Sequence, residues 1–358
     1  MRSLSWSNFP IVCLAALALA GCGSETPTGS GAGSGSSAPS ADGSSSSGDI
    51  KIVILTNGSS PFWDACNVGL KDAGKELGVR VELVRNDASE GGQIRRLEQL
   101  ATQDDVKGVG ISVLQKEASG VAEAMQALRT KGVKVITIDS DGPADAREAF
   151  VGTNNLEGGR ELGRLAAQLR PAGGKAVTFV GFAGAQNAIE RIGGFKEGAA
   201  SAKIEVVETK EDQTDQTKAQ NNVTAAIQNH PDVNVLAGIW SYNAPAITDV
   251  IQANGRRKDF TIVTFDCEPG AIVAMDQGLI DAMVVQDPYK MGYIGAKLLL
   301  SMIKQDQAAV DELLHGKDFY DTGLKVIVPD EKSTLQSPYR MALPAFKDWL
   351  KEKGLTGS

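Results

Sequence analysis

The sequence predicts an α/β fold of two doubly wound parallel-sheet lobes of similar topology. From residue 50 onward, short runs of β-branched residues alternate with stretches of helical periodicity, which is typical of parallel strands joined by helices. The expected strands, such as 51–55, are apolar along their whole length, so we expect helices on both faces of each sheet. The same order of elements occurs twice, which indicates two halves of similar build.

The first half is expected to alternate strands with helices. We expect strands at 51–55, 79–84, 108–113 and 134–139, and helices at 62–77, 93–103 and 118–129. The first helix has the required periodicity, because Cys66, Leu70, Ala73 and Leu77 form one apolar stripe. This stripe is expected to face the sheet.

The second half repeats this order. We expect strands at 176–181, 204–208, 233–239 and 261–266, and helices at 187–200, 218–229 and 244–253. The halves also share a glycine, since Gly69 lies 18 residues after Lys51 and Gly194 lies 19 residues after Lys175. Ligands bind at the carboxyl ends of strands in such sheets, so two facing edges predict a cleft.

Composition excludes several functional classes. The chain has 36 Lys and Arg against 44 Asp and Glu, a net charge of −8, and no basic run, so we expect no nucleic-acid partner. With two His and four Cys that lack paired C-x-x-C spacing, we expect no metal site. Neither a G-x-G-x-x-G loop nor a Walker loop is present, so we expect no cofactor.

The amino-terminal segment predicts export and a tether. Residues 1–21 are expected to be a lipoprotein signal peptide, because an apolar stretch too short to span a bilayer ends in Leu19-Ala-Gly-Cys22. This ending resembles the lipobox of bacterial lipoproteins and implies lipidation at Cys22. Residues 22–48 are expected to be a disordered Gly/Ser linker. The alternative is an ordinary cleaved signal with an incidental Cys.

Six short segments resemble one family in order and spacing. They are Ser59-Ser-Pro-Phe-Trp63, Val135-Ile-Thr-Ile-Asp139, Val151-Gly-Thr-Asn-Asn155 with Gly158 and Gly159, Glu190-Arg191 before Gly194, Val263-Thr-Phe-Asp266 and Val285-Gln-Asp-Pro288. On these residues the chain resembles the ribose-binding-protein family of periplasmic sugar-binding proteins. The resemblance implies a type I periplasmic-binding-protein fold with a three-segment hinge, which captures a monosaccharide by closing and serves an ABC permease.

The resemblance also implies where the lobes and the hinge lie. The N-terminal lobe is expected to comprise 50–153 and 285–310, and the C-terminal lobe 154–284 and 311–358. Hinge crossings are expected near Thr153, within 266–282 and within 303–314. The amphipathic segment 343–350 is expected to pack on a lobe, and the protein is expected to be a monomer with the membrane reached only through its lipid anchor.

Polar residues at strand ends are the first candidates for sugar binding. Asp139 and Asp266 end equivalent strands of the two halves, where a carboxylate can accept hydrogen bonds from adjacent hydroxyl groups. Arg191 can donate two parallel hydrogen bonds. Each residue has a structural alternative: a cap or turn for the acids, and a solvated pair with Glu190 or Glu197 for Arg191.

Further candidates follow from the resemblance and from the chemistry of sugars. An apolar sugar face needs an aromatic plate, and hydroxyl groups need amides or hydroxyls as partners. These candidates are Ser60, Phe62, Trp63, Ser140, Asn243 and Gln286. Ribose binders carry Asn in place of Ser60 and Arg in place of Ser140, so these departures argue against ribose itself.

Two alternatives to import share the same cleft. A sugar receptor that feeds a sensor or chemoreceptor would use the same closed lobes. A cleft enzyme could use Asp139 and Asp266 as glycosidase carboxylates, but two His that are not at strand ends complete no nucleophilic triad, so we do not expect an enzyme. Cys66 and Cys267 are expected to remain separate thiols, and a disulfide is the alternative.

Overall fold

The computed structural model describes residues 50–358, and its first lobe is built on one six-stranded sheet. The expected signal peptide 1–21, Cys22 and the linker 22–48 lie outside the described residues. The strands of this sheet are β1 (Lys51–Leu55), β2 (Arg80–Val84), β3 (Val106–Ile111), β4 (Lys134–Ile138), β5 (Ala149–Gly152) and β11 (Phe319–Asp321). The helices are α1 (Phe62–Leu77), α2 (Glu90–Leu100), α3 (Ser119–Thr130), α9 (Pro288–Ile303) and α10 (Gln307–Leu314).

The second lobe is built on a seven-stranded sheet. Its strands are β6 (Gly174–Val180), β7 (Ile204–Glu211), β8 (Val233–Gly238), β9 (Thr261–Phe265), β10 (Ala282–Val285), β12 (Lys325–Val328) and β13 (Arg340–Ala342). Its helices are α4 (Asn155–Leu169), α5 (Gln186–Ala199), α6 (Gln216–Asn229), α7 (Asn243–Ala253), α8 (Pro269–Asp276) and α11 (Leu343–Glu352).

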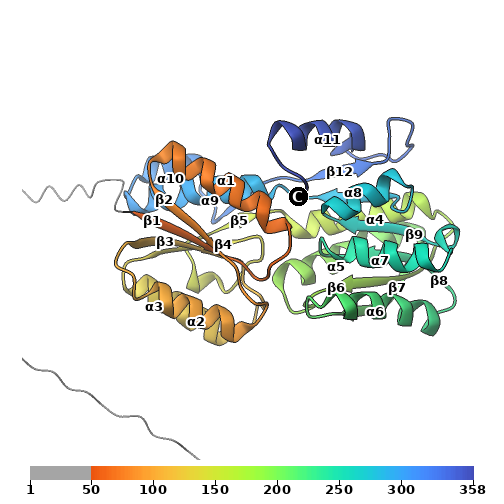
Figure 1. Cartoon of the computed structure of the whole chain (residues 1–358), viewed down its shortest axis with the longest axis horizontal. Helices are drawn as coiled ribbons and strands as arrows, with labels where there is room; N and C mark the ends of the chain where they lie inside the picture. Colours follow the sequence, from red (N-terminus) through yellow and green to blue (C-terminus); the bar gives the residue numbers. More distant parts are fainter. Residues whose placement is uncertain (1–49) are drawn as a thin grey trace, which may run out of the picture. The chain divides into compact units, whose positions relative to one another are not determined.

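The strand orders confirm two doubly wound sheets of similar topology (Figure 1). The first sheet runs β11-β5-β4-β3-β1-β2 and the second runs β13-β12-β10-β9-β8-β6-β7. Neighbouring strands pair in parallel except for β10 and β12, which are antiparallel. In each sheet the chain places its second strand on one side of the first strand and its third strand on the other side. The strand order therefore reverses between β1 and β3 in the first sheet and between β6 and β8 in the second. Sheets of this kind bind ligands at the position of the reversal.

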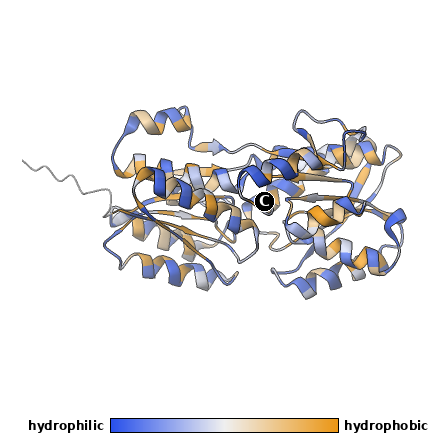
Figure 2. Ribbon diagram, turned by 45° about the horizontal axis from the view of Figure 1, so that its top comes forward, coloured by the Kyte–Doolittle hydropathy of each residue, from blue (hydrophilic) through white to orange (hydrophobic). Residues whose placement is uncertain are grey.

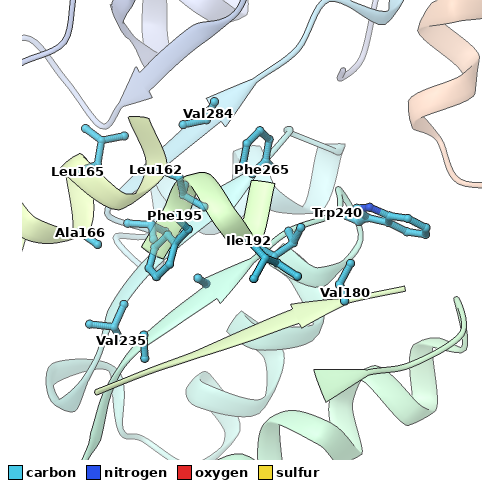
Figure 3. Packing of buried hydrophobic residues seen from close by; sticks show 14 of the residues in the cluster. Leu162, Leu165, Ala166, Val180, Ile192, Phe195, Val235, Trp240, Phe265 and Val284 are labelled. Atoms are coloured by element: carbon cyan, nitrogen blue, oxygen red, sulfur yellow. The ribbon is translucent and has the colours of Figure 1, made fainter. Parts of the chain in front are cut away.

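Alternating residues of one strand enter different hydrophobic cores, because helices cover both faces of each sheet. In β1, Ile52 and Ile54 pack with α1 and α9, whereas Val53 and Leu55 pack with α2 and α3. This explains why the strands are apolar throughout. Figure 2 shows hydrophobic strands and hydrophilic outer faces on the helices, and Figure 3 shows the core where α4 and α5 cover one face of the second sheet.

The chain passes between the two lobes at three places, two of which differ from expectation. The first crossing follows β5 at Thr153, as expected. The second lies at 286–287 instead of within 266–282, because β10 still pairs with β9 in the second sheet. The third lies at 322–324 instead of within 303–314.

The late third crossing has a physical cause in the edge of the first sheet. Strand β11 pairs in parallel with β5, Phe319 stacks on Phe150 with ring centroids 5.1 Å apart, and Asp318 accepts a hydrogen bond from Arg147. Residues 311–321 therefore lie with the first sheet, and the expectation that all of 311–358 belongs to the second lobe is wrong there. Helix α11 packs on the second lobe.

One helix pair in each lobe packs through glycines. A Cβ at Gly69 of α1 would overlap the backbone of Tyr289 in α9, and a Cβ at Gly292 of α9 would overlap that of Cys66. The second lobe repeats this arrangement, since a Cβ at Gly194 of α5 would overlap the carbonyl oxygen of Leu156 in α4. The repeated glycine thus marks a backbone-to-backbone contact in both halves.

We predict that Gly194→Ala destabilises the protein by about 1–3 kcal/mol, because the added methyl group forces α4 and α5 apart. Gly193→Ala is the matched control, since a Cβ at Gly193 would meet no atom within 4 Å. Because alanine has a higher helix propensity than glycine, the Gly193→Ala variant should be more stable than the wild type by about 0.5–1 kcal/mol. Urea unfolding of both variants measures the difference, and equal free energies of unfolding would contradict the close glycine contact.

Candidate functional site

A cavity of about 320 Å³ lies at the carboxyl ends of the strands of both lobes. Loops after β1 and β4 supply one wall, and α5 with the loops after β8 and β9 supplies the other. Gln286 enters from the second crossing. The lining residues are Asn57, Ser60, Phe62, Trp63, Asp139, Asn187, Arg191, Trp240, Ser241, Tyr242, Asp266 and Gln286.

Asp139 and Asp266 occupy equivalent positions and share an unusual backbone conformation. Each directly follows its strand, β4 or β9, and each is buried. Their φ angles are 64° and 61°, in the left-handed region that costs a residue other than glycine about 1–3 kcal/mol. Aspartate tolerates this region better than most residues. The same costly turn therefore carries a carboxylate to the cavity from each lobe.

The two carboxylates have different hydrogen-bond partners. Asp139 Oδ2 accepts from Ser112 Oγ at 2.9 Å and from Asn187 Nδ2 at 3.4 Å. Asp266 accepts from the backbone N–H of Gln286 at 3.2 Å and from its Nε2 at 3.0 Å. Neither carboxylate accepts a hydrogen bond from an N–H at the start of a helix within residues 50–358, so the helix-cap alternative is wrong, whereas both aspartates do lie in a turn.

Arg191 lies between the two carboxylates and is 1% exposed. Its Nη2 is 3.8 Å from Asp139 and its Nη1 is 4.0 Å from Asp266. The guanidinium also donates to Asn155 Oδ1 at 2.9 Å and to the carbonyl oxygen of Ile239 at 3.1 Å. The alternative of a solvated Arg191 paired with a neighbouring glutamate is therefore wrong.

The buried cluster contains two carboxylates and one guanidinium, and burial shifts the pKa of all three groups. Burial raises the pKa of Asp139 and raises the pKa of Asp266 to about 6. Burial also lowers the pKa of Arg191, against the opposing effect of the two carboxylates. With all three groups ionised the cluster carries one net negative charge, in a place where water contributes little screening.

Two polar atoms of the lining have no hydrogen-bond partner among residues 50–358. They are Arg191 Nη2, a donor, and Gln286 Oε1, an acceptor. A buried polar atom left without a partner costs about 1–3 kcal/mol. The cavity therefore offers one free donor and one free acceptor to a molecule that can both accept and donate.

Aromatic side chains line the cavity from both lobes. Phe62 and Trp63 occupy the first turn of α1, with ring centroids 5.1 Å apart at an interplanar angle of 86°. Trp240 and Tyr242 come from the loop between β8 and α7, and Figure 3 places Trp240 at the edge of the second-lobe core. An apolar ligand face would thus meet aromatic surfaces on two sides.

Two of the nine predicted site residues do not line the cavity. Ser140 is fully buried beside Asp139, and its Oγ has no hydrogen-bond partner in the described part of the chain. Asn243 turns into the second lobe, where it donates to Asp212 at 3.0 Å and accepts from the backbone N–H of Trp240 at 2.9 Å. These two predictions are corrected, because Ser140 is packed inside its lobe and Asn243 supports a loop that lines the cavity.

Five lining residues were not predicted: Asn57, Asn187, Trp240, Ser241 and Tyr242. All of them belong to segments that follow β1, β6 or β8. The rule that strand ends bind ligands identifies these segments. It does not identify which side chain in each segment reaches the cavity, because that depends on how the loop turns.

The lobes are in contact across the cavity. Asn187 of the second lobe donates to Asp139 of the first, and the backbone N–H of Lys116 donates to the carbonyl oxygen of Gly184 at 3.0 Å.

Cys66 and Cys267 are buried free thiols on opposite lobes. Burial raises the pKa of both thiols, so both remain protonated at neutral pH.

Residues 50–358 contain no group of His, Cys, Asp or Glu that could hold a metal ion. None of the helices in this part of the chain has the length and hydropathy of a membrane span. His230 Nε2 forms a hydrogen bond of 3.0 Å with Glu208 Oε2, and His315 directly follows α10.

Asp212 holds the loop that carries Trp240 and Tyr242. It is fully buried and accepts hydrogen bonds from the Tyr242 hydroxyl, from Asn243 Nδ2 and from the backbone N–H of Thr214 at 2.9 Å. Burial raises the pKa of Asp212 to about 6, against the opposing effect of these donors. One titratable group therefore supports two lining residues without itself lining the cavity.

We predict that Asp212 makes stability depend on pH. Its pKa in the folded protein lies above the ordinary value of 3.8, so its contribution to stability is complete below about pH 4 and is lost as pH rises through about 6. The loss amounts to about 2–3 kcal/mol. Urea unfolding of the wild type and of Asp212→Asn between pH 4 and 7 tests this: the wild type should lose stability relative to the variant as pH rises. A constant difference would show that Asp212 does not titrate in this range.

Comparisons with known proteins agree with this geometry. A family model described as a periplasmic binding protein domain matches residues 50–307. The ribose import binding protein of Bacillus subtilis is 26% identical over 270 residues, which cover 74% of this chain and 81% of that protein. The D-allose-binding periplasmic protein of Escherichia coli is 27% identical over 266 residues, which cover 70% of this chain and 84% of that protein.

Solved structures show the same similarity. An ABC transporter solute binding protein from Burkholderia graminis, in complex with D-arabinose, has a TM-score of 0.73 and 26% identity, and the match covers 82% of this chain and all (100%) of that one. A glucose-galactose binding protein from Geobacillus stearothermophilus has a TM-score of 0.70 and 27% identity, with 80% of this chain and 99% of that one covered.

Proposed function

Because this chain belongs to the family of periplasmic binding proteins, we propose that it captures a monosaccharide between its lobes and delivers it to an ABC permease. The type I fold of this family has two parallel sheets of similar topology, as this chain does. The relatives bear names that refer to ribose and allose, and one solved structure holds D-arabinose. The family consists of binding proteins, which agrees with the expectation that the chain is not an enzyme.

The observation that carries the proposal is the buried cluster of Asp139, Arg191 and Asp266 at the cavity. A sugar hydroxyl both donates and accepts, so one kind of group can satisfy the carboxylates, the free Nη2 of Arg191 and the free Oε1 of Gln286. Charge-assisted hydrogen bonds to these groups are stronger than neutral ones. The aromatic rings of both walls offer surface for the C–H face of a sugar ring.

The charge of the cluster favours neutral ligands. One guanidinium faces two carboxylates, so a sugar acid or a sugar phosphate would bring further negative charge into a buried site that already carries an excess. A neutral pentose, hexose or polyol meets no such penalty. Among neutral sugars ribose remains disfavoured, because Ser60 supplies a shorter polar group than the amide of ribose binders.

The closed lobes support capture by hinge movement. The chain crosses between the lobes at three places, and Thr153 Oγ1 and Thr322 Oγ1 of two of these crossings lie 3.4 Å apart. Separating the lobes would break the contact of Asn187 with Asp139 and would hydrate the cluster. A bound sugar bridges both walls, so it stabilises the closed lobes, which a permease can recognise.

A ligand panel tests the proposal directly. Isothermal titration calorimetry with neutral pentoses, hexoses and polyols should find at least one ligand that binds with micromolar or lower Kd. Each neutral sugar is paired with an anionic counterpart, such as D-ribose 5-phosphate or D-glucuronate, which should bind more weakly by roughly tenfold or more. Failure of every neutral sugar, or preference for the anionic member of a pair, would refute the proposed ligand class.

We predict that Asp139→Ala and Asp266→Ala each weaken binding of the sugar identified in this way by about 2–5 kcal/mol, because each substitution removes a buried carboxylate that accepts charge-assisted hydrogen bonds from sugar hydroxyl groups. Asp145→Ala is the control, since Asp145 is exposed and does not line the cavity. Its affinity should equal that of the wild type. An unchanged affinity in either cavity variant would remove that carboxylate from the binding site.

Membrane attachment through Cys22 is the second part of the proposal. The Leu19-Ala-Gly-Cys22 segment supports lipidation of an exported protein, which would hold the sugar-binding body at the cell envelope. After expression in a bacterium, the wild type should enter the detergent phase of a Triton X-114 partition. The Cys22→Ala variant should stay in the aqueous phase. Aqueous partition of the wild type would argue for an ordinary secreted protein.

A further inference from the structure

A second cavity adjoins the candidate site. It contains about 540 Å³ of empty space, part of it open to solvent, and we call it the outer chamber. Four of its residues, Asn57, Ser60, Trp240 and Tyr242, also line the inner cavity, so the two spaces lie side by side. The full lining of the outer chamber is Asn57, Gly58, Ser59, Ser60, Pro61, Thr214, Gln216, Trp240 and Tyr242.

The wall from the first lobe is held in place by hydrogen bonds. Arg85 Nη1 donates to the carbonyl oxygens of Ser59 at 3.1 Å and Ser60 at 3.2 Å. Thr56 Oγ1 donates to the carbonyl oxygen of Gly58 at 2.5 Å. Three consecutive residues of this loop thus have fixed carbonyl groups, so the wall is preorganised.

The wall from the second lobe is equally constrained. Asp212 binds the Tyr242 hydroxyl and the backbone N–H of Thr214. Thr214 has a φ of 64°, which the surrounding contacts must maintain. A Cβ at Gly181 would overlap the ring of Trp240 and approach the Tyr242 hydroxyl to 2.7 Å, so this glycine lets both aromatic side chains lie against the backbone.

The space between these walls is open. A Cβ at Gly58 would meet no atom within 4 Å, although the residue itself is buried. Ser59, Pro61 and Gln216 are exposed, so the chamber opens to solvent at these residues. The chamber thus provides space next to the inner cavity, on its solvent side, while the lobes are closed.

The lining chemistry of the outer chamber differs from that of the inner cavity. None of its nine lining residues carries a charge, whereas the inner cavity has three buried charges. It offers hydroxyl and amide groups beside the indole ring of Trp240. Neutral hydrogen-bonding groups beside an aromatic ring match the hydroxyl groups and C–H face of a second sugar ring.

We propose that the outer chamber is a second saccharide subsite, so that the ligand class includes disaccharides and glycosides whose first ring occupies the inner cavity. The proposal rests on the proposed function, because it assumes a sugar in the inner cavity. The alternative role of the outer chamber is that of a path by which a single sugar ring enters the inner cavity. The two roles differ in what a glycosidic substituent does to affinity.

The test compares single sugars with extended forms of the same sugar. Calorimetry is run with D-glucose, maltose and cellobiose, with D-galactose, lactose and melibiose, and with D-xylose and xylobiose. At least one extended ligand should bind as tightly as its single sugar or more tightly. Binding of single sugars alone, with a loss of roughly tenfold or more on extension, overturns the subsite and leaves the proposed function intact. Binding of none of these saccharides and of no neutral sugar in the earlier panel rejects the proposed function itself; where a sugar of that panel binds instead, the comparison is made with its own glycosides.

A variant series at Gly58 locates the second ring. Gly58→Leu fills the open space beside this residue, and Gly58→Ala removes the glycine while filling little of it. Gly58→Leu should weaken binding of the extended ligand by about tenfold or more, and Gly58→Ala by much less. Binding of the single sugar, which reports an intact inner cavity, should change by less than about twofold in both variants. An extended ligand that binds Gly58→Leu as tightly as the wild type places the second ring elsewhere and overturns the proposal.

Discussion

The buried contact of Arg191 with Asp139 and Asp266 is the interaction on which the rest of the site depends. Charges taken out of water are costly unless they are paired and hydrogen-bonded, and each of these three groups is at most 4% exposed. Their remaining partners, Ser112, Asn187, Asn155 and Gln286, come from both lobes and from the second crossing. The cluster is therefore complete only when the lobes lie together. A neutral molecule rich in hydroxyl groups can supply the hydrogen bonds that Arg191 Nη2 and Gln286 Oε1 still lack.

The fold brings these charges together through its internal repetition. Each half ends one strand in a left-handed aspartate, and each half packs one pair of helices through glycines. The glycine contacts of the second lobe position Arg191 beside the two aspartates. Gly159 of α4 lies against the backbone of Arg191 in α5, and Gly158 lies against the ring of Phe265. The guanidinium in turn stacks on Phe265 at 4.4 Å. The close approach of two helices thus determines where the one buried cation of the site lies.

The inner cavity is lined by charged side chains, whereas the outer chamber on its solvent side is lined by neutral residues. The innermost groups are ionised and paired, whereas the outer chamber presents neutral side chains held by Arg85 on one wall and Asp212 on the other. Both supporting residues lie behind the lining and act through carbonyl, amide and hydroxyl groups. Rigid walls lower the entropic cost of binding, because the loops are ordered before a ligand arrives. Selection for neutral ligands and accommodation of a larger ligand therefore arise from separate parts of the cleft.

The periodicity of the sequence predicts strands β1 to β4 and β6 to β9, and it places an acid at the ends of β4 and β9. Runs such as 51–55 are apolar throughout and lie between helical stretches, which predicts strands covered on both faces, and a polar residue at the end of such a strand lies at the carboxyl edge of its sheet. Tertiary structure alone decided that β11 joins β5, that the later crossings lie at 286–287 and 322–324, and that Tyr242 reaches the cavity while Asn243 supports it from behind. The physical reason is that pairing between distant strands, and the direction in which a loop side chain points, depend on contacts far apart in the chain, which local periodicity does not encode.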